Sequence, residues 1–209
     1  VHWPDPNVPF DQVADILERF LDRGRIRAVG VSNYSPGQMD QFRKGGPLHT
    51  CQPPYNLFER GIEDDVLPYC HREGVSTLTY GALCRGLLSG KMSREREFFG
   101  DDLRKTDPKF QGDRFDQYLE AVDRLEEYAR DEHGKEVIHL AVRWLLDRPG
   151  VSVALWGARK PEQLDAIDGV MGWELTDEDY QTIDDILDET ISDPVGPEFM
   201  APPARDAAE

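Results

Sequence analysis

The sequence is poor in cysteine and contains no long hydrophobic run. Its three cysteines (Cys51, Cys70 and Cys84) are odd in number and fall inside predicted elements. They make a poor disulfide framework and fit a reducing compartment. No apolar stretch approaches the ~20 residues that span a membrane. The start, VHWPDPNVPF, lacks the basic-then-apolar pattern of a signal peptide. We therefore expect a cytoplasmic protein without a membrane partner.

Positive charge is also scarce. The chain has 24 Lys and Arg against 41 Asp and Glu, a formal net charge of −17. A surface this acidic repels phosphate backbones, so we expect no nucleic-acid partner. The acidic residues are spread through predicted helices and are typical of solvated helix faces. An anionic cofactor would therefore need local positive charge.

Three kinds of site are not indicated by the sequence. The Gly-rich GxGxxG turn of an open dinucleotide-binding sheet is absent. The stretch Gly86–Met92 has glycines too close together for a phosphate loop, and Met92 stands where that loop needs Ser or Thr. Histidines other than His2 are scattered, and Cys70-His71 has no companion pair, so no metal site is expected.

Hydrophobic periodicity predicts alternating helices and strands. The predicted helices are 10–23, 35–44, 62–73, 114–132, 135–147, 161–167 and 177–191, the last with Thr176 as its N-cap. The predicted strands are 25–31, 48–52, 75–80 and 151–156, and residues 1–2 read as the end of another. Residues 92–113 read as a long loop, a feature that is often functional. The Pro- and Ala-rich tail, 193–209, is expected to be irregular.

Strands separated by helices pair in parallel through right-handed crossovers. The strand ends fall near residues 2, 32, 52, 80 and 156, and each carries a polar or aromatic group. A (β/α)8 TIM barrel places its site at such carboxyl ends. Eight strands are needed to close that barrel, so the α/β chain is expected to form part of one over residues 1–192, with a C-terminal helix.

Five segments carry a resemblance to a known family. They are His2-Trp3-Pro4, Gly30–Asn33, Gln52–Asn56, Tyr80–Lys91 and Gly157–Leu164. In this order and at these spacings they resemble the aldo-keto reductases, and the long 92–113 loop with Gly86–Lys91 resembles the bacterial-type branch. The resemblance implies about five βα units, strands 4 to 8 of the barrel, with the earlier strands absent from this chain.

That resemblance implies a hydride transfer between NADPH and a small-molecule carbonyl or alcohol, such as an aldehyde, ketone or sugar. Ser32, Asn33 and Gln52 match residues that hold the nicotinamide carboxamide, which offers both donors and an acceptor. Tyr80 matches the aromatic residue that stacks on the ring. The pyrophosphate segment is matched by Gly81, Leu83, Arg85, Gly86 and Lys91. The adenosine end is matched by Gly157, Arg159 and Gln163, and an arginine there favours NADP(H).

His2 matches the histidine that donates to the substrate carbonyl and stabilises the developing oxyanion. The family's proton donor is a tyrosine whose pKa is lowered by a lysine paired with an aspartate. No Tyr, Lys or Asp of this chain stands in the matching context. Ala166 and Ile167 replace the acidic residue and Asn that often read adenine, and Trp156 replaces a frequent Pro.

The alternative interpretation is a non-catalytic NADPH-binding regulatory subunit or remnant. A barrel hydrolase is a weaker hypothesis, because it predicts metal ligands at the strand ends.

Overall fold

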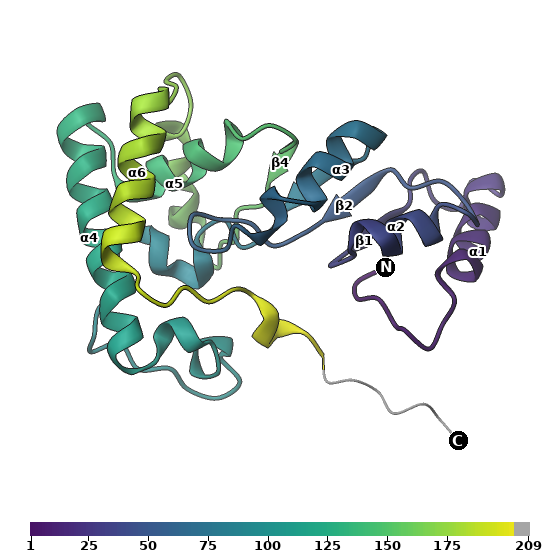
Figure 1. Ribbon diagram of the computed structural model, residues 1–209, viewed down its shortest axis with the longest axis horizontal. Coiled ribbons are helices and arrows are strands. Elements are labelled where there is room, and N and C mark those ends of the chain that lie inside the picture. Colours follow the sequence, from purple (N-terminus) through teal and green to yellow (C-terminus); the bar gives the residue numbers. More distant parts are fainter. Residues whose placement is uncertain (203–209) are drawn as a thin grey trace.

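Four short parallel strands form the centre of the computed structural model, which describes residues 1–202 (Figure 1). They are β1 (Gly30–Ser32), β2 (Thr50–Gln52), β3 (Ser76–Thr79) and β4 (Val153–Ala154). Their spatial order is β1-β2-β3-β4, with Val31 opposite Cys51 and Leu78 opposite Val153. Neighbours that follow in chain order form part of a (β/α)8 barrel wall, whereas an open doubly wound sheet reverses its order at a switch point.

The strands are shorter than the hydrophobic pattern predicted. The prediction of a strand over 25–31 was wrong at its start, because only Gly30–Ser32 lies on the ladder. The end of a strand predicted at residues 1–2 carries no assigned strand, but Val1 donates to Gly30 O at 2.7 Å and accepts from Ser32 N at 2.8 Å. These two bonds continue the pairing beyond β1 in the manner of one more strand.

The α-helices follow the amphipathic segments closely. They are α1 (Phe10–Asp22), α2 (Pro36–Phe42), α3 (Val66–Glu73), α4 (Gly112–His133), α5 (Val137–Leu146) and α6 (Asp177–Thr190). Caps account for several of their ends. Ser35 and Gln38 form a capping box at the start of α2, and the left-handed glycines Gly74 and Gly134 end α3 and α4.

Two helical predictions and one loop prediction needed correction. The helix predicted over 62–73 divides into a 3-10 turn, Gly61–Glu63, and α3, because Asp65 caps Val66 N and starts a new helix. The segment predicted as a helix over 161–167 is a 3-10 helix, Pro161–Gly169. The predicted loop 92–113 contains two 3-10 turns, Leu103–Lys105 and Pro108–Phe110.

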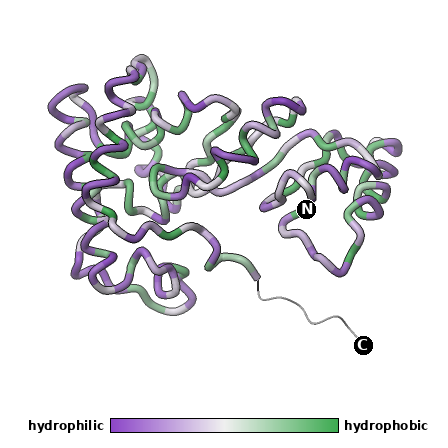
Figure 2. Tube along the Cα trace, viewed as in Figure 1, coloured by the Kyte–Doolittle hydropathy of each residue, from purple (hydrophilic) through white to green (hydrophobic). Residues whose placement is uncertain are grey.

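Two hydrophobic cores lie at opposite ends of the sheet. One joins α1, α2 and α3 to β1 and β2 around Met39, Phe42 and Cys51, all fully buried. The other joins α4, α5 and α6 to the segments after β2 and β3 around Tyr118, Leu140 and Trp144. At the left of Figure 2 the outer turns of α4 are largely hydrophilic, and hydrophobic stretches face the neighbouring helices. Each core therefore consists of the apolar helix faces that pack against neighbouring elements.

The tail is more ordered than its composition predicted. It forms a 3-10 turn, Glu198–Met200, and Val195 N donates to Tyr118 Oη at 3.2 Å. Residues 203–209, the rest of the predicted irregular tail, lie outside the described residues. Within the described residues, no helix combines the length and the apolar character needed to cross a membrane.

Candidate functional site at the strand ends

The carboxyl ends of the strands bring five of the predicted residues into one hydrogen-bonded group. Ser32 Oγ donates to Gln52 O at 2.7 Å and accepts from Asn33 Nδ2 at 3.0 Å. The same Asn33 nitrogen lies 3.2 Å from His2 O, and Tyr80 Oη donates to Asn33 Oδ1 at 2.8 Å. Parallel pairing aligns these strand ends, so residues far apart in sequence meet.

Asn33 is the centre of this group and has an unusual backbone. Its φ of 63° lies in the left-handed region, which asparagine tolerates better than most residues. This conformation turns the chain sharply after β1 and directs the amide toward both His2 and Tyr80. Burial, with a smaller contribution from the Glu59 charge, raises the pKa of Tyr80 to about 12, so its hydroxyl stays protonated and donates.

Two of the predicted residues retain free polar groups. Among the residues that the structure describes, neither the His2 ring nor the Gln52 side-chain amide makes a hydrogen bond. His2 is exposed and Gln52 is half-buried. A neutral imidazole offers one donor and one acceptor, and an amide offers two donors and an acceptor. The arrangement can therefore receive a carboxamide and a carbonyl side by side.

The segment after β3 forms a cradle of left-handed residues. Gly81, Cys84, Arg85, Gly86 and Gly90 have φ values of 75°, 43°, 53°, 96° and 68°. The loop starts where Asn56 Nδ2 donates to Gly81 O at 3.0 Å. Backbone that turns in this way can aim several N–H groups at one anion. Leu83 packs against the core, and Lys91 is exposed at the far end.

Arg85 lies in this cradle, but its guanidinium contacts carboxylates. It pairs with Glu59, and its Nε lies 2.5 Å from Asp107 Oδ2. Lys109 Nζ completes the cluster at 2.8 Å from Glu59 Oε1. Burial alone would raise the pKa of Glu59, but the charges of Arg85 and Lys109 lower it below its ordinary value. The arginine therefore holds protein segments together in this structure.

The predicted adenosine end lies at the start of the 3-10 helix Pro161–Gly169. Gln163 Oε1 accepts from Arg159 N at 2.6 Å and from Lys160 N at 3.0 Å, and Gly157, Arg159 and Gln163 are all exposed. The pKa of Asp102 is lowered to about 2, mainly by the hydrogen bond from Arg104 and to a smaller extent by the Arg159 charge.

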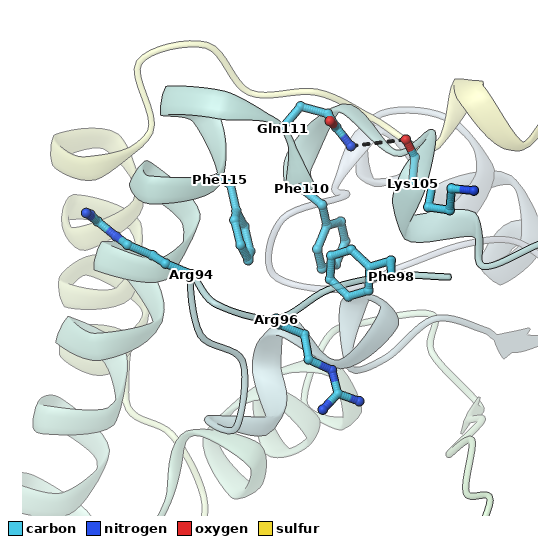
Figure 3. Close-up of a pocket in the computed structure, with 7 residues that line it drawn as sticks. All are labelled: Arg94, Arg96, Phe98, Lys105, Phe110, Gln111 and Phe115. Carbon is cyan, nitrogen blue, oxygen red and sulfur yellow. Dashed lines mark hydrogen bonds between the residues drawn. The ribbon is translucent and has the colours of Figure 1, made fainter. Parts of the chain in front are cut away.

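A separate cavity of about 300 Å³ lies under the 92–111 segment (Figure 3). Phe98, Phe110 and Phe115 form its apolar wall. The side chains of Arg94 and Arg96 point away from these rings in Figure 3, and Arg94 is paired with Asp116 at 2.9 Å. None of the predicted site residues lines it, so it is not part of the strand-end group.

The residues that support the site were not predicted from the sequence. Asn56, Glu59, Asp107 and Lys109 are fully buried, yet none was predicted to matter. Asn56 belongs to the segment Gln52–Asn56, and its place after β2 was the one available signal. Glu59 and Asp107 lie 48 positions apart in ordinary polar loops, so no local pattern could pair them.

The residues present fit a nicotinamide dinucleotide. Free donors and acceptors stand at the strand ends, the half-buried ring of Tyr80 lies beside them, and a cradle of left-handed backbone follows. Two exposed cations are also present: Lys91 at the far end of the cradle and Arg159 at the predicted adenosine end. Such a donor set suits a carboxamide at one end and phosphates at the other.

Comparison with known proteins identifies a family. The aldo/keto reductase family model matches residues 1–188. The chain is 60% identical over 206 residues to the aldo-keto reductase YhdN of Bacillus subtilis, covering 99% of this chain and 62% of that protein. It is 27% identical to the NADH-specific methylglyoxal reductase of Escherichia coli, covering 85% of this chain and 55% of that one.

A solved structure is similar as well. The glycerol dehydrogenase AKR11B4 of Gluconobacter oxydans has a TM-score of 0.86 at 53% identity, covering 96% of this chain and 61% of that chain. The chain thus spans about three-fifths of the length of these two relatives. By the match over residues 1–188 and the identity with these relatives, the chain belongs to the aldo/keto reductase family, in its bacterial-type branch.

Proposed function

We propose that this chain provides the cofactor side of an oxidoreductase that transfers hydride between NADP(H) and a small carbonyl or alcohol. The observation that carries the proposal is the strand-end group, in which Asn33 ties His2, Ser32 and Tyr80 together while Gln52 and the His2 ring keep free polar atoms. Family membership supports the reaction class.

Each residue of the group has a distinct task under this proposal. Ser32, Asn33 and Gln52 hold the carboxamide, which fixes the face of the nicotinamide that the substrate meets. Tyr80 supports the ring by stacking, a contact of about 1 kcal/mol. The bound cofactor supplies the hydride. The remaining residues, Gly81, Leu83, Arg85, Gly86 and Lys91, shape the pyrophosphate segment.

His2 is the proposed catalytic residue. Its exposed imidazole stands at the strand ends, and its backbone carbonyl is held by Asn33 Nδ2 at 3.2 Å. A ring N–H there can donate to a substrate carbonyl and stabilise the negative charge that develops on its oxygen. Removing one such donor costs about 100-fold or more in turnover.

NADP(H) is proposed over NAD(H) because of Arg159. Its guanidinium is exposed beside Gly157 and Gln163 and could form charge-assisted hydrogen bonds with a 2′-phosphate. Positive charge is scarce on the rest of a chain whose net charge is −17. One relative is named as NADH-specific, so the preference needs a direct test in this chain.

The test is a fluorescence titration of the purified protein with NADPH and NADH. We expect tighter binding of NADPH, and Arg159→Gln should weaken NADPH binding by about 10-fold while leaving NADH unchanged. Lys44→Gln removes a positive charge at the end of α2 and is the matched control. Equal binding of both cofactors by the unaltered protein would refute the role of Arg159.

Because no tyrosine of this chain matches the family's proton donor, turnover is measured on the complete gene product, with NADPH and a panel of aldehydes, ketones and sugars. Reduction that falls about 100-fold in His2→Ala, with NADPH affinity unchanged, is the expected result. Cofactor binding without reduction of any member would favour the regulatory, non-catalytic alternative. Absence of both binding and reduction would refute the proposed function.

A further inference from the structure

Four charged side chains form a buried cluster, and three of them, Glu59, Asp107 and Lys109, have no task in the proposed chemistry. Glu59, Asp107 and Lys109 are fully buried, and the side chain of Arg85 is 14% exposed. Two carboxylates and two cations cancel in formal charge. Because burying ions is costly unless each is paired in good geometry, such a cluster constrains the segments that contribute to it.

The contacts join four segments that are distant in sequence. Arg85 lies between Glu59 and Asp107, and Lys109 Nζ contacts Glu59 Oε1 at 2.8 Å and Asp107 Oδ1 at 3.5 Å. Lys109 Nζ also donates to Gly196 O at 3.0 Å. The loop after β2, the cradle after β3, the 92–111 segment and the tail therefore meet at one point.

Glu59 holds the cradle at two places. Its Oε1 pairs with Arg85 in the middle of the cradle. Its Oε2 accepts from Asn56 Nδ2 at 2.8 Å, and that nitrogen also donates to Gly81 O at the start of the cradle. Cys84 and Arg85 have positive φ without being glycine. Such residues persist only where surrounding contacts hold them, and the ion pairs to Arg85 provide that restraint.

The tail covers the other side of the cluster. The ring of Phe199 lies 4.9 Å from Arg85 Cζ and 5.6 Å from Lys109 Nζ, and Met200 Sδ is 3.6 Å from Arg85 Nη1. Cation–π contacts gain strength where the cation is shielded from water, as here. Residues 196–200 therefore touch the same two cations that hold the cradle.

We propose that Glu59, Lys109 and Phe199 are positioning residues that set the shape of the 81–91 cradle through Arg85, and that Arg85 supports the pyrophosphate segment from behind instead of binding phosphate itself. This inference rests on the proposed cofactor function, since it says how that site is preformed. It makes the tail part of the cofactor site without direct contact with the cofactor.

The two possible roles of Arg85 predict opposite results for Glu59→Gln. If Arg85 bound phosphate directly, removing a competing carboxylate would free it and tighten NADPH binding. As a positioning residue it loses its restraint, and we expect the Kd for NADPH to rise about 10-fold. Glu63→Gln is the control, because Glu63 pairs with Arg60 and Arg148 outside the cradle. It should lower the melting temperature and leave the Kd unchanged.

Phe199→Leu provides a milder variant in case Glu59→Gln does not fold. It keeps apolar bulk but removes the aromatic face, and we expect a rise of about threefold in the Kd for NADPH. An unchanged or lower Kd in both variants would overturn the positioning role.

Hydrogen exchange of the 84–90 amides in the cofactor-free protein tests the same coupling without any ligand. We expect faster exchange in Glu59→Gln and Phe199→Leu than in the unaltered protein and in Glu63→Gln. Unchanged exchange at 84–90 would overturn the inference even if NADPH binds. Failure of the unaltered protein to bind either nicotinamide cofactor would refute the proposed function, while the exchange rates would still decide whether the cluster and tail hold the cradle.

Discussion

At the scale of single residues, Asn33 shows how one side chain can organise a site. Its amide reaches His2, Ser32 and Tyr80, which come from three different places in the chain. The left-handed backbone at this position makes that reach possible. The sequence could predict the meeting of these residues because each was expected at a strand end, and parallel strands end at the same edge. The hydrogen bond between Asn33 and Tyr80 could not be predicted, because it depends on side-chain geometry.

Asn33→Ala should destabilise the protein by about 2–3 kcal/mol. The change removes the amide's hydrogen bonds, and each well-formed bond contributes about 1 kcal/mol. It also places alanine at φ 63°, and alanine lacks the polar side chain that helps asparagine tolerate the left-handed region. Asn33→Gly loses the same bonds but accepts the backbone, so it should cost about 1 kcal/mol less. Urea unfolding measures both. Equal costs for Ala and Gly would contradict the left-handed conformation.

At the scale of elements, helix ends were the best-predicted features. The prediction of α6 over 177–191 with Thr176 as its N-cap matches Asp177–Thr190, and Thr176 Oγ1 accepts from Asp179 N at 3.2 Å. Strand lengths were the least predictable. Residues 25–29 (Arg-Ile-Arg-Ala-Val) place Ile and Val next to polar residues as a strand can. A residue joins a sheet only where a neighbouring strand offers a partner, and β2 pairs with three residues of β1. Local sequence does not contain that information.

The N-terminus of α6 predicts a specific acid sensitivity. Burial by itself would raise the pKa of Asp179, but hydrogen bonds from Tyr128, Thr176 and His133 lower it to about 2. A lowered carboxyl pKa adds stability above the unfolded-state value near 4, and that stability is lost as the pH falls from about 4 to about 2. The contribution is about 2 kcal/mol.

Asp179→Asn should therefore be less stable than the unaltered protein at pH 6, and the difference should shrink toward pH 2. Urea unfolding across this pH range measures it. Asp131→Asn is the control, because Asp131 is an exposed residue whose ion pair with Arg130 lies on the surface of α4. A stability difference for Asp179→Asn that stays constant with pH would contradict the lowered pKa.

The contact between α1 and the turn after α2 depends on a glycine. A Cβ on Gly45 would lie 1.8 Å from Asp11 O, a backbone atom that cannot move aside without shifting α1. Gly45→Ala should therefore destabilise the protein by about 3 kcal/mol or more. Gly37, in α2, has open space around it, and Gly37→Ala should be neutral or stabilising by up to about 1 kcal/mol. Similar melting temperatures for the two variants would show that α1 does not pack this closely.

At the scale of the whole molecule, charge is distributed in two contrasting ways. The buried cluster around Arg85 is balanced, and its partners come from four separate segments. The surface is strongly unbalanced, with a net charge of −17. Composition alone revealed the acidic net charge, whereas the buried cluster could be recognised only from the fold. Screening by salt should act very differently on the two, because buried pairs are screened much less than exposed charges.

Repulsion among surface carboxylates should make the protein more stable as salt is added. Raising NaCl from about 10 mM to about 500 mM shortens the Debye length from roughly 30 Å to a few ångströms, which screens like charges across the surface. The buried pairs keep most of their strength, so the net effect is a higher melting temperature. Sucrose at matched osmolality controls for preferential exclusion, and KCl should reproduce the NaCl curve. A melting temperature that falls with NaCl would show that exposed ion pairs, such as Arg124 with Glu189, outweigh the repulsion of the excess acid.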